Sequence, residues 1–315
     1  MDIMNRGGGI INTMKATREA SEAELADHAM DHLKKMLAMG VTTVEAKSGY
    51  GQDYDTEIKQ LHVTRKLNAS QPIELVSTFL GAHAVPPEYK GRSKAFLDFL
   101  LKEVMPVVKK ENLAEFCDIF CEEGVFSVDE SRQYLKKARE MGFKLKIHAD
   151  EIVSLGGSEL AGELKATSAD HLLHASDAGI KAMAENGVVS TLLPTTAFCL
   201  REPFARAREM IDAGCAVALA TDFNPGSGFT FSVPLMLGLA VIYMHMTAEE
   251  AITALTLNGA AAVGRADRIG SIEVGKQADL TILQYPSYKF LPYHTGVNIV
   301  EKVIKKGELV HTASV

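Results

Sequence analysis

Short apolar runs alternate with longer amphipathic stretches along most of the chain. The apolar runs are rich in β-branched and aliphatic residues, and apolar residues with helical spacing recur between them. We expect strands at 41–46, 73–79, 116–120, 143–147, 168–171, 188–193 and 216–221. Apolar strands that alternate with helices are typical of a parallel sheet covered on both faces.

Local signals mark where the intervening helices begin and end. Three Ser/Thr-x-x-Glu sequences predict capping boxes, at Ser21–Glu24, Ser127–Glu130 and Thr247–Glu250. Four glycines stand directly before an expected strand and predict helix C-caps: Gly40, Gly142, Gly187 and Gly214. One helix is expected from about 20 to 38.

Seven βα units are one fewer than a closed eightfold barrel requires. We therefore predict an α/β fold, a TIM-like (β/α) barrel whose first βα unit is missing, because the loop Arg6–Ile10 precedes a helix rather than a strand. After about Gly264 the pattern changes to glycine-turned β segments at 270–283 and 299–310. The expected domains are an N-terminally incomplete barrel at 1–264 and a β-sandwich annex at 265–315.

Composition narrows the class of protein. The 315 residues are 47% hydrophobic and 23% charged, with a net charge of −7, which argues against nucleic acid or an anionic membrane as the main partner. The chain has neither a long apolar run nor a signal-peptide pattern, so we expect a cytoplasmic protein. The four cysteines lack paired C-x-x-C hooks and are interpreted as reduced thiols.

Polar and ionisable residues recur where the expected strands end. In a parallel barrel, these positions carry the catalytic groups. The residues concerned are Glu45, Lys47, Tyr50, His83, Cys121, Glu122, His148, Glu151, Asp170, His171, His174, Thr195, Thr196, Asp222 and Asn224. A lone strand-end histidine is more often structural, but His148 together with Asp150, Glu151 and Asp222 suits zinc or iron, which favour imidazole and carboxylate ligands.

Two of these positions allow alternative interpretations. The segment 223–227, Phe-Asn-Pro-Gly-Ser, predicts a tight turn whose N–H groups hold a substrate carboxylate or carbonyl, or else a plain βα turn. Lys47 is either a Schiff-base nucleophile or an ion-pair partner of Glu45 or Asp53.

Five motifs together resemble the imidazolonepropionase family, the amidohydrolases of histidine degradation. They are Lys-Ser-Gly-Tyr-Gly at 47–51, Gly-Ala-His-Ala-Val-Pro at 81–86, Lys-Ile-His-Ala-Asp-Glu at 146–151, Ser-Ala-Asp-His at 168–171 and Thr-Asp-Phe-Asn-Pro-Gly at 221–226. The similarity runs from 7–10 to 292–294. The first and last of the five motifs are the most specific to this branch, because strand-end histidines and aspartates recur across amidohydrolases.

The resemblance implies one zinc or iron ion in a barrel with a small β-sandwich, a small-molecule substrate and a homodimer. It implies metal ligation by His148 and Asp222, with Glu151, His171 and Asp222 as catalytic groups. It implies substrate contacts from Tyr50, His83, Glu151, Asn224, Gly226 and Ser227. The implied reaction is hydrolysis of 4-imidazolone-5-propanoate to N-formimidoyl-L-glutamate by a metal-activated water, with Asp222 accepting the water's proton and Glu151 or His171 protonating the leaving nitrogen.

One feature of the family pattern is missing. The family's first strand carries a His-x-His metal pair and then an arginine that binds the propanoate, and this sequence contains no His-x-His. We expect the ligand pair and the eighth strand to be missing together, which weakens metal binding. The alternatives are another cyclic-amide or deaminating amidohydrolase, an inactive truncated remnant that acts as a binding partner, and a Schiff-base lyase that uses Lys47.

Overall fold

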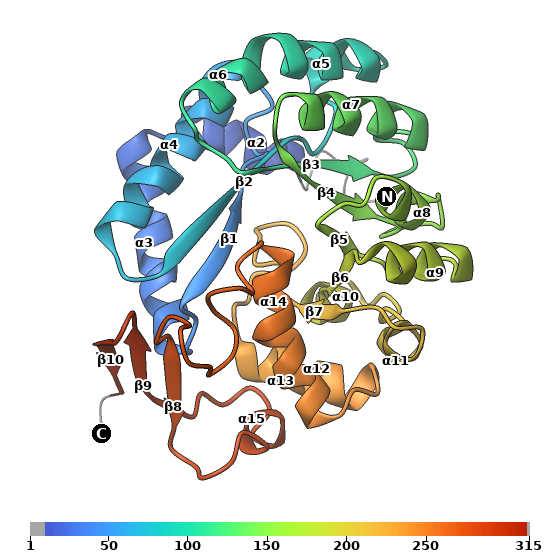
Figure 1. The fold of residues 1–315 in the computed structure, drawn as a ribbon. Coiled ribbons are helices and arrows are strands. Elements are labelled where there is room, and N and C mark those ends of the chain that lie inside the picture. The colour runs from blue at the N-terminus through green and yellow to red at the C-terminus, as the bar shows by residue number, and fades with distance from the viewer. Residues whose placement is uncertain (1–9, 314–315) are drawn as a thin grey trace.

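The seven predicted strands form one parallel sheet in chain order, which curls into an open barrel (Figure 1). The computed structural model describes residues 10–313. The strands of this sheet are β1 Thr43–Lys47, β2 Glu74–Ala82, β3 Phe116–Cys121, β4 Lys144–Ala149, β5 Ser168–His171, β6 Val189–Leu192 and β7 Val217–Leu219. The predicted fold class, an open (β/α) barrel with a small C-terminal sheet, is confirmed.

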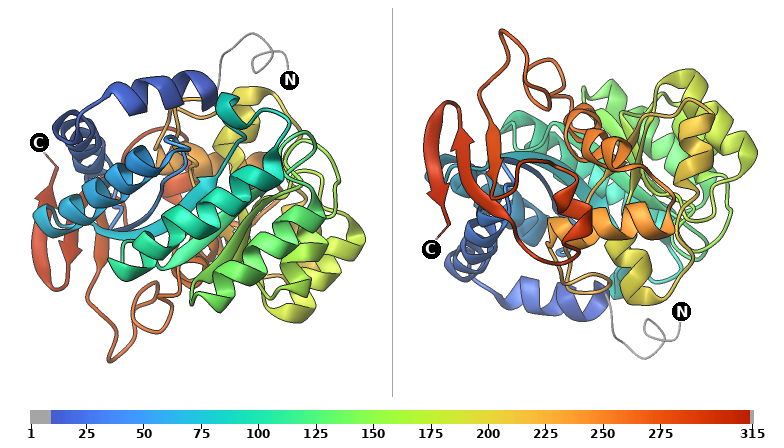
Figure 2. Two further views of the ribbon diagram at one scale, coloured as in Figure 1. Left: turned by 90° about the horizontal axis from the view of Figure 1, so that it is seen from above. Right: turned by 90° about the horizontal axis from the view of Figure 1, so that it is seen from below.

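Helices cover the outer face of the curled sheet (Figure 2). The α-helices are α2 Ile10–Glu19, α3 Glu22–Ala38, α4 Tyr54–Ser70, α5 Ser93–Phe99, α6 Met105–Lys110, α7 Val128–Glu140, α8 Gly157–Glu163, α9 Asp177–Asn186, α10 Pro194–Leu200, α11 Ala207–Asp212, α12 Val233–Tyr243, α13 Ala248–Leu255, α14 Leu257–Ala262 and α15 Phe290–Tyr293. A 3-10 turn, η1 Pro87–Tyr89, and a π-helical turn, η2 Leu100–Val104, lie between β2 and β3. The main core, which includes Phe96, Ile119 and Leu135, fills the space between sheet and helices.

The capping boxes and glycine C-caps that the sequence predicts are present in the structure. All three capping boxes form, at the starts of α3, α7 and α13. The four glycines adopt positive φ angles between +67° and +91°, a region that an L side chain rarely enters. The expected cap chemistry therefore closes the helices that lead into β1, β4, β6 and β7.

Several boundaries differ from expectation. Ile10, the last residue of the predicted loop Arg6–Ile10, begins helix α2, and residues 6–9 of that loop lie outside the described part of the chain. Strand β2 runs on to Ala82, so His83 follows it directly. Only 280–283 of the β-like segment 270–283 is a strand, because Gly270 and Gly275, at φ +94° and +92°, bend the chain before it.

A second, antiparallel sheet lies beside α3 and the N-terminal end of β1 (Figure 1). Its strands are β8 Leu280–Leu283, β9 Val300–Lys305 and β10 Glu308–Thr312. The side chain of Thr281 donates to the carbonyl of Gly40 at 2.9 Å, and that of Asn298 donates to the carbonyl of Ala38 at 2.8 Å. These bonds join the C-terminal sheet to the loop that enters the barrel.

Within residues 10–313, β1 and β7 each pair on one side only. Helices α13 and α14 pack against β7 near the opening between these two edge strands (Figure 1). Among the described helices, none is long and apolar enough to span a membrane.

Helices α8 and α9 pack closely against each other at Gly162, and this contact yields a stability prediction. A Cβ added at Gly162 would lie 2.7 Å from the Cβ of Ala182 and 2.8 Å from its carbonyl carbon. We expect Gly162→Ala to lower the free energy of unfolding by about 1–3 kcal/mol, since overpacking forces backbone shifts. Urea unfolding of both proteins measures the difference.

The matched control is Gly259→Ala in α14, where the nearest atom to an added Cβ is 3.5 Å away. Alanine favours helix there without a clash, so stability should stay equal or rise by up to about 1 kcal/mol. Equal losses for both variants would contradict the packing argument.

Glu74 at the start of β2 generates a pH prediction. Its carboxylate accepts hydrogen bonds from Arg265, at 3.1 Å, and from Arg268. Burial opposes ionisation of Glu74, but the two arginines outweigh it and lower the pKa below the ordinary value. An acid with a lowered folded pKa stabilises the protein above its unfolded pKa, and this stabilisation is lost as the pH falls through the folded pKa.

We therefore expect Glu74→Gln to lower stability at pH 7. The difference from the parent protein should start to shrink below the ordinary carboxylate pKa of about 4.3 and vanish only when the pH falls through the lower folded pKa of Glu74. Unfolding midpoints measured from pH 7 to pH 3 test this. A difference that stays constant over that range would refute an ionic contribution from Glu74.

Candidate active site

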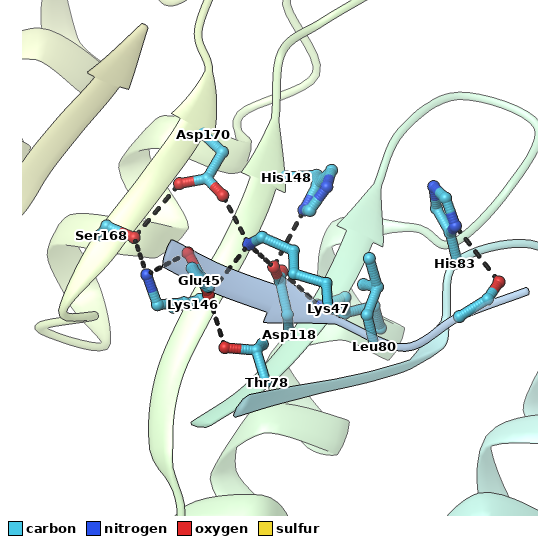
Figure 3. Close-up of polar contacts among 12 residues, drawn as sticks. Glu45, Lys47, Thr78, Leu80, His83, Asp118, Lys146, His148, Ser168 and Asp170 are labelled. Carbon is cyan, nitrogen blue, oxygen red and sulfur yellow. Dashed lines mark hydrogen bonds and ion pairs between the residues drawn. The ribbon is translucent and has the colours of Figure 1, made fainter. Parts of the chain in front are cut away.

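A buried ion network ties three strands together inside the barrel (Figure 3). The Nζ atom of Lys47, at the end of β1, donates to Oδ2 of Asp118 in β3 at 2.6 Å and to Oδ2 of Asp170 in β5 at 2.7 Å. These are alternate strands, which in a barrel send their inward side chains into a common layer. Lys47 also lies 3.4 Å from Glu45.

A second lysine extends this network. Lys146 in β4 is fully buried, and its Nζ donates to Oε2 of Glu45 at 3.0 Å, to Ser168 at 3.0 Å and to the carbonyl of Ala262 at 2.8 Å. The other carboxylate oxygen of Glu45 accepts a bond from Thr78 at 2.5 Å. We call Lys47, Lys146, Glu45, Asp118 and Asp170 the barrel network. With every member ionised, it has three negative and two positive charges.

The environment of Lys47 decides between its two sequence-based interpretations. Burial by itself lowers the pKa of Lys47, but the carboxylates of Asp118, Asp170 and Glu45 outweigh it and raise the pKa well above the ordinary value. A permanently protonated amine is a poor nucleophile, so the contacts favour the ion-pair role. Glu45 is one of its partners, whereas Asp53 pairs instead with Arg18 at 2.8 Å.

Three imidazoles follow one another above the barrel network. The ring centroid of His148 lies 5.9 Å from that of His83 and 5.1 Å from that of His171. Burial first, and then the neighbouring His148, lower the pKa of His83 to about 3, so His83 is neutral. Burial also opposes protonation of His148, but Asp118 outweighs it and raises the pKa of His148.

Two of these histidines each face a carboxylate through Nδ1. Nδ1 of His148 lies 3.0 Å from Oδ2 of Asp118, and Nδ1 of His171 lies 3.5 Å from Oε1 of Glu151. Both nitrogens are buried, yet neither makes a hydrogen bond of good geometry. We take the two contacts as ion-pair distances that lack hydrogen-bond direction, because distance and direction are separate requirements.

Among residues 10–313, one group of three has ligand atoms that all lie within 4.8 Å of one another: Asp118, His148 and Asp170. Imidazole and carboxylate suit a divalent metal such as zinc or iron. Asp222 is not in this group, and its Oδ2 accepts a bond from Thr196 at 2.7 Å. Asp118 was not among the sequence candidates, although a single acidic residue within the apolar strand Phe116–Cys121 is a usable signal.

The site residues that the family resemblance implies all line one cavity of about 1660 Å³, whereas the strand-end candidates Cys121, Glu122, His174, Thr195 and Thr196 are not part of its lining. Its lining includes Tyr50, His83, His148, Glu151, His171, Asp222, Asn224, Gly226 and Ser227. Burial first, and then the charges of Asp222 and Glu151, raise the pKa of the Tyr50 phenol. The cavity also reaches the inner face of α3. The fold thus brings all the site residues that the resemblance implies to one space.

The turn after β7 is closed by its own asparagine. Oδ1 of Asn224 accepts bonds from the amides of Gly226 and Ser227, both at 2.8 Å, and its Nδ2 donates to the carbonyl of Asp222 at 2.8 Å. These backbone N–H groups are therefore already bonded. The structure favours an Asx-type turn that fixes the shape of the loop over a free anion-binding turn.

Two buried carboxylates fix the loop that carries Glu151. Oε2 of Glu122 accepts bonds from the amides of Glu151, at 3.0 Å, and Ile152, at 2.8 Å. Asp150, at φ +50°, accepts bonds from four successive backbone amides, 155–158. Sequence reasoning placed Glu122 near the site but gave it no role, since its partners lie about thirty residues further along the chain.

This geometry predicts that Glu122→Gln loosens the loop at Glu151. A bond from an amide to a charged acceptor is worth about 1.5–3 kcal/mol, so the amides of Glu151 and Ile152 should exchange with solvent roughly 10–100-fold faster. Hydrogen exchange followed by NMR measures this. Glu123→Gln, at an exposed neighbouring side chain, is the control, and unchanged exchange in Glu122→Gln would contradict the tether.

The sequence matches the amidohydrolase family over residues 2–310. A curated relative from Clostridium tetani, named imidazolonepropionase, is 66% identical over 314 residues, which cover 100% of this chain and 75% of that protein. A relative of the same name from Parabacteroides distasonis is 62% identical and covers 98% of this chain and 74% of its own length. The chain spans about three quarters of these relatives.

Solved structures agree on the fold. A guanine deaminase from C. acetobutylicum with bound guanine superimposes with a TM-score of 0.71 at 16% identity, covering 95% of this chain and 78% of that one. An adenosine deaminase from Xanthomonas campestris with bound zinc gives 0.67 at 20% identity, covering 93% and 71%. At such identities the likeness concerns the fold alone. The sequence matches go further, and the chain belongs to the amidohydrolase family, in the group of the imidazolonepropionases.

Proposed function

We propose that the chain hydrolyses the ring amide of 4-imidazolone-5-propanoate. The observation that carries this proposal is the identity of 61–66% to eight curated relatives named imidazolonepropionase, over 98–100% of this chain. Water adds across the ring C–N bond, the bond breaks, and the product is N-formimidoyl-L-glutamate. The meeting of His148, Glu151, His171 and Asp222 at one cavity supports this chemistry.

We assign metal ligation to His148 and Asp222. When bound, a divalent metal supplies a water of lowered pKa and polarises the ring carbonyl. Asp222 is the carboxylate that would accept the proton of the attacking water, and its bond from Thr196 holds it in place. Imidazole and carboxylate ligands suit both zinc and iron, so elemental analysis of the purified protein distinguishes the two metals.

Proton delivery to the leaving nitrogen falls to Glu151 and His171. Their side chains are 3.5 Å apart, close enough for one proton to be held between them beside the cavity. His171 adopts a φ of +76° at the end of β5, a strained conformation of the kind found at functional sites. Glu122 supports this pair from below by bonding the amide of Glu151.

Substrate binding is assigned to Tyr50, His83, Glu151, Asn224, Gly226 and Ser227. His83 is neutral and bonds the carbonyl of Gly49 through Nδ1 at 3.3 Å, which leaves its other nitrogen for the ring of the substrate. The phenol of Tyr50, whose pKa is raised, is a hydrogen-bond donor at neutral pH. In the turn, the hydroxyl of Ser227 and the shape set by Asn224 act on the substrate, because the amides are already bonded.

We further propose that residues 1–264 form the barrel unit and residues 265–315 the annex, which holds β8–β10. The homodimer and the cytoplasmic location stay predictions of the family resemblance. Sedimentation of the purified chain tests the first, and fractionation of the source cells tests the second.

A second candidate is a chain that binds the imidazolone without turning it over. The observation that favours it is the absence of any His-x-His pair from the sequence, since two ligands bind a metal less firmly than four. The two candidates differ in product formation and in metal content.

The deciding experiment supplies fresh 4-imidazolone-5-propanoate to the 315-residue chain, with zinc or iron added, and follows the product by NMR. We expect turnover, and we expect Asp222→Asn to reduce it roughly 10²–10⁴-fold because the proton acceptor is lost. Glu185→Gln on the exposed face of α9 is the control. Binding without product, together with no metal by elemental analysis, would replace the hydrolase by the second candidate.

A further inference from the structure

We propose that Asp118 is a positioning residue that holds His148 in the tautomer protonated at Nδ1, so that Nε2 is the nitrogen free for a metal. Lys47 acts as the partner that holds the Asp118 carboxylate in place. This proposal rests on the proposed function only in naming the metal as the ligand of Nε2. The tautomer itself is a property of the metal-free chain.

The contacts of Asp118 fix its carboxylate on both sides. Its Oδ2 lies 3.0 Å from Nδ1 of His148 and accepts a bond from Lys47 at 2.6 Å. Its Oδ1 accepts a bond from the amide of Ile119 at 2.8 Å. Asp118 has no exposed surface and His148 is only 6% exposed, so water does not compete for these contacts.

The chemistry of imidazole turns this contact into a choice of nitrogen. A neutral ring has one N–H donor and one lone-pair acceptor, and a carboxylate can only accept. The proton therefore belongs on Nδ1, beside Asp118, and the lone pair on Nε2. Histidines that bind metals commonly turn their other N–H toward a carboxylate, and the 3.0 Å contact places the Asp118 carboxylate on the Nδ1 side of the ring. Among residues 10–313, no hydrogen bond engages Nε2 of His148.

A direct metal-ligand role for Asp118 and Asp170 is less consistent with the charges. Their Oδ2 atoms already share the ammonium of Lys47, at 2.6 and 2.7 Å (Figure 3). A divalent cation between these oxygens would have to displace that ammonium or lie beside it, and like charges at such distances repel strongly in a buried site. The ion network thus directs a metal to the far side of the His148 ring.

The test is the tautomer of His148 in metal-free protein labelled with ¹⁵N-histidine. Long-range ¹H–¹⁵N spectra distinguish a protonated from an unprotonated ring nitrogen, and His148→Gln identifies the signals. Spectra are recorded at a pH at which titration shows the ring to be neutral. We expect Nδ1–H in the parent protein and a shift toward Nε2–H, or a mixture, in Asp118→Asn.

Asp170→Asn is the matched control. This substitution removes another carboxylate that pairs with Lys47 in the same network. Unlike Asp118, Asp170 makes no contact with the His148 ring within ion-pair distance. It should leave the Nδ1–H tautomer unchanged. Asp118→Glu, which keeps the charge, should retain Nδ1–H at least in part. Backbone spectra of distant helices check that each variant is folded.

Two results would overturn the proposal: an Nε2–H ring in the parent protein, or a folded Asp118→Asn whose tautomer is unchanged. If Asp118→Asn does not fold, the parent tautomer and the Asp170→Asn spectrum still decide. Zinc alone, titrated against a chelating dye, gives a second readout, with an expected loss of affinity of about 10–100-fold in Asp118→Asn. The tautomer needs neither metal nor substrate, so an inactive chain with Nδ1–H would refute only the proposed function.

Discussion

The contact of Lys47 with Asp118 and Asp170 is the constraint on which the interior of this molecule depends. It joins β1, β3 and β5 across a barrel whose edge strands β1 and β7 do not pair within the described residues. Burying ions is expensive, and removing one partner of such a pair costs roughly 3–5 kcal/mol because a bare charge stays behind. Every charge of the barrel network therefore has a partner, Lys146 with Glu45 included.

The charge of the barrel network also affects the neighbouring histidines of the site. Three carboxylates face two ammonium groups, so the balance favours a further positive charge near His148, either on the ring or on a bound metal. His83 is neutral beside it, because burial and the neighbouring imidazole disfavour a second proton. A site that accepts one cation and keeps its other imidazoles as hydrogen-bond donors and acceptors suits hydrolysis of a small heterocycle.

Backbone strain is concentrated at the same end of the barrel. Asp150, His171, Leu172 and Asp222 adopt positive φ angles, and all follow or end a strand of the sheet. Such conformations persist only where the surroundings hold them, as the four amide bonds to Asp150 and the bond from Thr196 to Asp222 do. Glu151, His171 and Asp222, at or next to these strained positions, all line the same cavity.

The sequence by itself determined the seven strands, their parallel order, the capping boxes and the strand-end residues His148, His171 and Asp222, because these follow from local periodicity and from a motif-level resemblance. Only the tertiary structure decided the partners. Asp118 and Glu122 gained roles through contacts about thirty residues or more away along the chain. Asn224 closed its own turn, which the local sequence left open. Local patterns fix where a strand lies, whereas the partner of a buried charge is fixed by how all the strands curl together.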